Sequence, residues 1–174
     1  MVWTIATEAC LFVYLLFSFV YLGAQQRGPW PPQGPLSLSL ALPNTAILLL
    51  SSGVYMWGER GIRRGSQTQL RVGLLLTFAL GAVFAVIQGI EWHSQSFTAQ
   101  SDAFGSLFFT ITGFHGAHVI VGLLLNAVVQ IWAWRGTFTA DRHLAVTNAG
   151  LYWHFADVAW LFVFMTNYLL PRWG

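Results

Sequence analysis

Two histidines lie near the middle of the longest uncharged stretch of the chain. Residues 103–134 contain no acidic side chain, arginine or lysine, yet they include His115 and His118. A spacing of three residues puts both imidazoles on one face of a helix. Such a pair can chelate a metal ion, bind a haem or hydrogen-bond to a neighbouring helix. No third ligand at a suitable spacing is evident, so we expect both histidines to serve packing, with no metal bound.

A carboxyl group lies in the first apolar stretch. Glu8 is about 10 Å from the start of a helix that rises 1.5 Å per residue, which places it within the hydrocarbon layer of a membrane. A charged carboxylate is costly there, so Glu8 must be protonated or paired. Two interpretations stay open: a neutral, hydrogen-bonded side chain that specifies packing, or a site for protons or lipid headgroups.

Two further polar pairs have helical spacing. His154 and Asp157 are three residues apart and can satisfy each other locally. Gln88 and Glu91 have the same spacing, and we expect Glu91 to reach water near the end of its apolar segment. The sequence contains no nucleotide-binding loop, serine elbow or zinc-protease motif. These polar residues therefore do not make up a complete catalytic site.

The composition indicates that lipid covers much of the surface. Hydrophobic residues make up 56% of the chain and charged residues 8%, against about a quarter charged in soluble proteins. The net charge of +2 comes from dispersed arginines and does not suggest nucleic acid binding. Cys10 is the single cysteine, which excludes an intrachain disulfide. We therefore predict an all-α, polytopic membrane protein.

The apolar segments predict five transmembrane helices in a single transmembrane domain, residues 1–174. Each segment has about the length that a helix needs to cross a bilayer. The predicted helices cover residues 5–24, 36–57, 70–92, 104–134 and 145–170. The first segment has no basic region and no cleavage site, so we expect it to be retained. Pro43 predicts that the second helix either starts near it or is kinked before it.

The arginines predict the orientation of the bundle. Six of them flank the side shared by the N-terminus and the second and fourth loops, and two flank the other side. This bias places the N-terminus in the cytoplasm or the equivalent compartment. Tryptophans near the segment ends are typical of an interfacial belt: Trp3, Trp30, Trp57, Trp92, Trp132, Trp134 and Trp173. Small residues predict close helix packing: Gly81, Ala85 and Gly89, and then Gly113, Gly116 and Ala117.

Four blocks, in order along the chain, resemble those of a known family. They are TEACLFVYLLFSFVY, LPNTAILLLSSGV, IQGIEWHSQSFTAQSDAFGSLFFTITGFHGAHVIVG and YWHFADVAWLFVF. The third block contains Glu91, Asp102, Gly105, Phe108, Gly113, His115, Gly116 and His118, and the fourth contains Trp153, His154, Phe155, Asp157 and Trp160. Together they resemble subunit III of the haem-copper respiratory oxidases over nearly the whole chain.

The resemblance implies a non-catalytic subunit of a cytochrome c or quinol oxidase, which reduces oxygen to water and pumps protons. The haems and copper would belong to partner subunits I and II, and this chain would pack on subunit I, hold structural phospholipid and support proton uptake and stability. It implies lipid- or proton-related roles for Glu8, His154 and Asp157. It implies packing roles for His115, His118, Gly113, Gly116, Glu91 and Trp153.

The resemblance also implies a location. The chain is similar to the five-helix bacterial forms, which predicts a bacterial plasma membrane. Larger family members have two additional leading helices and a lipid-filled cleft, so a neighbouring subunit would have to complete that cleft. Two alternatives stay open: a related accessory protein of nitric oxide reductase, and a stand-alone membrane protein that binds haem or transports a solute.

Overall fold

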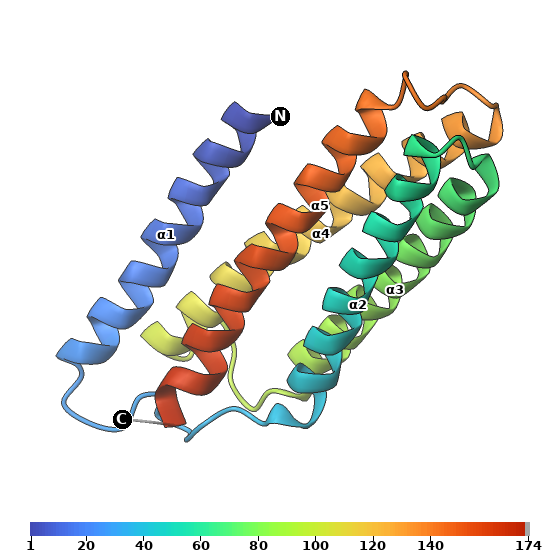
Figure 1. Ribbon diagram of the computed structural model, residues 1–174. Helices are drawn as coiled ribbons and strands as arrows, with labels where there is room; N and C mark the ends of the chain where they lie inside the picture. Colours follow the sequence, from blue (N-terminus) through green and yellow to red (C-terminus); the bar gives the residue numbers. More distant parts are fainter. Residues whose placement is uncertain (173–174) are drawn as a thin grey trace.

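The protein is a bundle of long helices, described by a computed structural model over residues 1–172 (Figure 1). Trp173 of the predicted tryptophan belt lies outside the described residues. The helices are α1 (Val2–Gln25), α2 (Leu38–Arg63), α3 (Gln67–Ser94), α4 (Ala103–Trp134) and α5 (Leu144–Phe164). A π-helical turn, η1 (Met165–Leu169), and a 3-10 turn, η2 (Leu170–Arg172), follow directly. Residues 1–172 contain no strand, which confirms the all-α prediction.

Four of the described helices, α1 to α4, are long and apolar enough to cross a membrane. The fifth predicted segment forms α5 as a helix of 21 residues. It carries His154 and Asp157 and is not among the four, so its crossing of the membrane stays a prediction.

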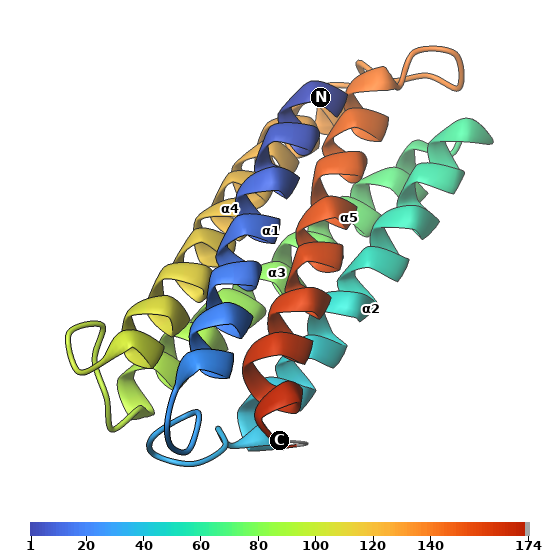
Figure 2. The same cartoon turned by 90° about the vertical axis from the view of Figure 1, so that its left-hand side faces the viewer.

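The helices run side by side, with the connections gathered at two ends. The N-terminus, the α2–α3 turn and the α4–α5 loop lie at one end (Figures 1 and 2). The α1–α2 loop, the α3–α4 loop and η2 lie at the opposite end. The two groups of arginines that predict the orientation therefore lie at opposite ends of the bundle, as that prediction requires.

The second helix begins earlier than Pro43. It starts at Leu38, where the Ser37 hydroxyl accepts a hydrogen bond from the Ser39 amide, and Pro43 lies inside the helix. The interpretation that the helix starts near Pro43 is therefore wrong. The cap at Ser37 stabilises a first turn ahead of the proline, which lacks a backbone donor and crowds the carbonyl four residues earlier.

Glycines bring α2 and α3 close together along their shared interface. A Cβ atom on Gly73 would lie 2.6 Å from Cα of Gly58, so the two backbones are in contact. The turn between the helices contains Gly65 at φ +82°, a conformation that favours glycine. The Ser66 hydroxyl then caps α3 by accepting from the Gln69 amide at 3.3 Å.

The core contains two groups of buried side chains. The larger includes Phe84, Phe108 and Trp160 and takes side chains from all five helices. The smaller surrounds Tyr55 and Leu74. Helix α1 contacts α4, α5 and η1 but only 11% of its most apolar stretch is buried inside the protein. Most of α1 is therefore available to lipid or to another protein.

Candidate functional site

A carboxyl group and an imidazole connect α1 to α4. Glu8 Oε2 lies 3.1 Å from Nε2 of His118, and the other ring nitrogen, Nδ1, donates to the Phe114 carbonyl at 2.7 Å. Because Nδ1 must carry a proton to donate, Nε2 either accepts from a protonated Glu8 or donates a second proton to a carboxylate. In either arrangement a hydrogen bond between these two side chains joins α1 to α4.

His115 lies on the same helix but has a different partner. Its side chain is fully buried, Nε2 donates to the Ala156 carbonyl of α5 at 3.2 Å, and its ring packs on Trp160 at a centroid distance of 4.7 Å. The two histidines of α4 therefore contact groups on different helices, His115 on α5 and His118 on α1. Among residues 1–172 no group of three or more histidine, cysteine or acidic side chains could hold a metal ion.

A serine on α2 joins the two polar residues of α5. The Ser52 hydroxyl lies 2.5 Å from Nδ1 of His154 and donates to Oδ2 of Asp157. Because the Ser52 hydroxyl donates its hydrogen bond to Asp157, its oxygen is free to accept a hydrogen bond from Nδ1–H of His154. The expected local pairing of His154 with Asp157 is therefore replaced by a bridge between helices. Sequence reasoning missed this role of Ser52, although its signal is the Ser-Ser-Gly of the second block.

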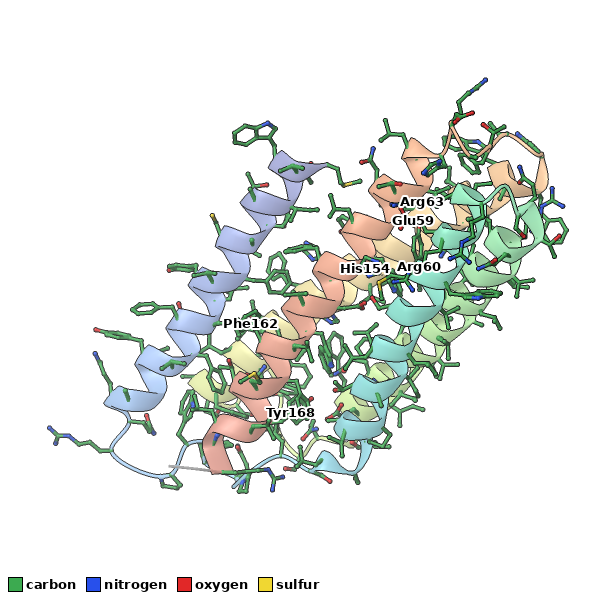
Figure 3. The ribbon with its side chains drawn as sticks, viewed as in Figure 1. Glu59, Arg60, Arg63, His154, Phe162 and Tyr168 are labelled. Atoms are coloured by element: carbon green, nitrogen blue, oxygen red, sulfur yellow. The ribbon has the colours of Figure 1, made fainter. Side chains whose placement is uncertain are left out.

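The polar contacts between α2 and α5 continue toward the end of the bundle. Glu59 accepts hydrogen bonds from Arg63 at 2.7 Å and from Thr147 of α5 at 2.8 Å. Figure 3 shows His154, Glu59 and Arg63 in this order toward the end that holds the α2–α3 turn. The helices α2 and α5 are thus joined by hydrogen bonds over several turns.

Trp153 occupies the space that two glycines leave. A Cβ atom on Gly81 would lie 2.5 Å from the Trp153 ring, and one on Gly122 would lie 2.7 Å from it. The indole donates to the Ser51 hydroxyl at 3.0 Å. This one side chain therefore contacts α2, α3 and α4 from its position on α5.

Glu91 is buried, contrary to the expectation that it reaches water. It is 3% exposed, and Tyr168 of η1 lies beside it. The reason is that the turn after α5 covers this face of α3. Gln88, one helical turn away, is also buried, at 4% exposed. Of the predicted small residues, Gly113 leaves space in which an added Cβ atom would meet only the Trp92 ring, at 3.7 Å, and a Cβ atom on Gly116 would meet nothing within 4 Å.

The sites brought together by the fold are thus hydrogen bonds between membrane helices. Glu8 pairs with His118, while His154 and Asp157 form a separate group with Ser52. The group of Ser52, His154 and Asp157 lies inside the bundle, whereas the Glu8 side chain at the other site is 36% exposed. The fold and the apolar helices define a helical membrane protein whose buried polar residues form hydrogen bonds between helices.

Comparisons with known proteins identify the family. Residues 1–174 match the family model described as cytochrome c oxidase subunit III. Proteins named cytochrome c oxidase subunit 3 are 37% identical in Hippopotamus amphibius and in Gallus gallus, each over 175 residues, and 38% identical in Struthio camelus over 179 residues. Each alignment covers 97% of this chain and 67% of the relative. The chain belongs to the cytochrome c oxidase subunit III family.

Proposed function

We propose that this chain is the third subunit of an aerobic haem-copper oxidase and packs on subunit I, with the haems and copper held by subunits I and II. Membership in the family makes it a subunit of an oxidoreductase complex, and the match covers the whole chain. The sites described above agree with this role, because they join helices and hold protons.

We also propose that residues 1–174 form one transmembrane domain in which α5 is the fifth span. The 21 residues of α5 extend about 31 Å at 1.5 Å per residue, close to the thickness of the hydrocarbon layer. Its polar residues lower its hydropathy, but Ser52 of α2 satisfies His154 and Asp157 inside the bundle. A helix surrounded by other helices can cross a membrane with such residues.

The exposed apolar face of α1 is the observation that carries the packing role. Val13, Tyr14 and Phe17 are each about two thirds exposed, and Tyr21 is half exposed. A face of this kind needs lipid acyl chains or another subunit to cover it. Glu8 lies on the same helix with a side chain that is 36% exposed, which supports a role in holding lipid headgroups or taking up protons.

The proposed setting is a bacterial plasma membrane. The five-helix resemblance supports it, while the relatives named above come from animals and do not distinguish this membrane from the mitochondrial inner membrane. The electron donor would bind to a partner subunit.

Purification from the native membrane tests the proposed function. An affinity-tagged chain extracted in a mild detergent should co-migrate with a haem-containing subunit, identified by mass spectrometry and by its absorption spectrum. Deletion of the chain should shorten the working lifetime of the oxidase. Recovery of the chain as a lone monomer, together with unchanged oxidase activity after deletion, would contradict the proposal.

A further inference from the structure

A serine, a histidine and an aspartate meet between α2 and α5. The Ser52 hydroxyl lies 2.5 Å from Nδ1 of His154 and also contacts Oδ2 of Asp157. Among residues 1–172, neither the His154 nor the Asp157 side chain forms any other hydrogen bond. A hydrogen-bonded path for a proton between these two side chains therefore passes through Ser52.

Asp157 needs compensation for any negative charge that it carries. It is 3% exposed, and its second oxygen, Oδ1, has no hydrogen-bond partner among the described residues. A buried carboxylate is costly unless a positive charge lies close to it. His154 is the titratable group to which Ser52 connects it. Asp157 is therefore either protonated or balanced by a protonated His154.

These two states contain the same number of protons and differ by a proton shift across Ser52. In the first, Asp157 donates to Oγ of Ser52, and the Ser52 hydroxyl donates to Nδ1 of a neutral His154. In the second, Nδ1–H of a protonated His154 donates to Oγ, and the hydroxyl donates to the Asp157 carboxylate. The shift breaks the Oδ2–H bond of Asp157 and forms a new Oγ–H bond. The former Oγ–H bond breaks at the same time as Nδ1–H forms, so the step needs no other reactant.

His154 connects this group to the end of the bundle that holds the α2–α3 turn. It is partly exposed, whereas Asp157 is covered. Glu59 lies on the side of His154 toward that end (Figure 3), within electrostatic reach of the imidazole. Because Glu59 pairs with Arg63 at 2.7 Å, it is a carboxylate, and a carboxylate stabilises a nearby imidazolium. His154 is thus the member through which a proton enters or leaves.

The other titratable groups on the elements packed against α5 have contacts of their own. The Tyr55 ring of α2 packs edge-to-face on His154 at a centroid distance of 5.9 Å, but its hydroxyl donates to the Val146 carbonyl at 2.7 Å. The groups on α1, α4 and η1 have these partners: Glu8 with His118, His115 with the Ala156 carbonyl, and Tyr168 beside Glu91 of α3. These contacts include neither His154 nor Asp157.

We propose that Ser52 passes a proton between Asp157 and His154, and that the three side chains take up and release protons as one unit at the arginine-rich end of the bundle. This unit is a proton-binding site within the chain itself. The proposal deepens the proton role proposed above. Its use by the oxidase rests on that role, whereas the proton shift rests on the contacts of Ser52.

Titration of the full chain in detergent tests the proposal. NMR of isotope-labelled histidine shows which ring nitrogens of His154 carry a proton, and the infrared carbonyl band shows whether Asp157 carries one. The variants His154→Gln and Asp157→Asn assign the two signals. Because the midpoints of a coupled titration belong to the pair, every pH step of the wild type should appear at the same midpoint in both signals.

Removal of the Ser52 hydroxyl should separate the two signals. In Ser52→Ala each pH step should appear in one signal only, with midpoints at least about one pH unit apart, since a hydrogen bond to a charged group changes a protonation equilibrium by that much. Ser52→Thr keeps a hydroxyl and should keep the shared steps. Ser18→Ala is the matched control and should titrate like the wild type, because the Ser18 hydroxyl bonds only to the Tyr14 carbonyl of its own helix.

Three results would overturn the proposal. Separate midpoints in the wild type would show that His154 and Asp157 titrate independently. Shared steps in Ser52→Ala, together with a lower unfolding temperature, would mean that Ser52 only joins the helices. If Ser52→Thr titrates like Ser52→Ala, the hydroxyl is not the proton carrier. A wild-type chain that co-purifies with no oxidase subunit would contradict the proposed function but leave these titrations unchanged, so the two failures are distinguishable.

Discussion

At the scale of single residues, a hydrogen bond between Glu8 and His118 joins α1 to α4. A glutamine at position 8 can donate its amide proton to Nε2 of His118, so the hydrogen bond survives while titration is lost. Glu8→Gln should therefore keep α1 in place, and Glu8→Ala should not. Loss of this hydrogen bond removes about 0.5–1.5 kcal/mol, and contacts between membrane helices lie at the lower end of that range.

Subunit retention and working lifetime of the oxidase measure this difference. We expect the glutamine variant to match the wild type and the alanine variant to weaken retention and shorten the lifetime. Thr7→Ala is the control, because Thr7 is exposed and its hydroxyl bonds only to the Thr4 carbonyl of its own helix. A glutamine variant with intact assembly but clearly slower proton uptake would show that titration of Glu8 matters.

These contacts show how much of the candidate sites could be predicted from residue types and their spacing. The polar residues in apolar segments could be found from the sequence, since burial of such groups is unusual enough to mark a site. Their partners could not, because the pairing of Glu8 with His118 depends on which helix faces which. The role of Ser52 could not be predicted either, because a single hydroxyl in a membrane helix usually forms a hydrogen bond to the backbone of its own helix.

At the scale of elements, the sequence predicted the number and order of the long helices, because runs of about twenty apolar residues are a strong signal. Their ends were less predictable. Helix α2 extends beyond its apolar segment, through the charged residues Glu59 and Arg60, to Arg63. It begins after the cap at Ser37. The small residues of one helix differ in their surroundings, and their spacing alone does not show this difference. The Trp153 ring occupies the space beside Gly81, whereas the space beside Gly89 is open.

The contact between α2 and α3 predicts that an alanine substitution changes the stability of the protein differently at two glycines. Gly73→Ala should destabilise the protein by about 1–3 kcal/mol, because its methyl group would overlap the backbone at Gly58, which cannot rotate away. Gly53→Ala meets nothing within 4 Å, so it should be neutral or stabilise the helix by up to about 1 kcal/mol. Thermal unfolding in one detergent measures both. Equal effects of the two changes would mean that α2 and α3 do not pack by direct backbone contact.

At the scale of the whole molecule, the charge distribution gives the bundle a direction. The arginine-rich α2–α3 turn and the α4–α5 loop lie at the end with the N-terminus, as Figures 1 and 2 show. Arg71 belongs to this group and is fixed there, since its Nε donates to the Ala133 carbonyl at 3.1 Å and its guanidinium lies 5.2 Å from the Trp134 ring. Arginines that flank membrane helices stay on the cytoplasmic side or its equivalent, so we propose that this end faces that side.

Thiol labelling from one side of the membrane tests this orientation. In a Cys10→Ala background each variant has one thiol: Thr68→Cys at the arginine-rich end, or Gln100→Cys in the α3–α4 loop, both at exposed positions. In sealed, right-side-out vesicles an impermeant maleimide should label Gln100→Cys at once and Thr68→Cys only after the membrane is permeabilised. Both positions lie outside the apolar stretches, so a difference in labelling reports the side and not the depth. The reverse pattern would place the N-terminus outside, and the arginine bias would then have to be overridden by the assembly of this chain with its partner subunits.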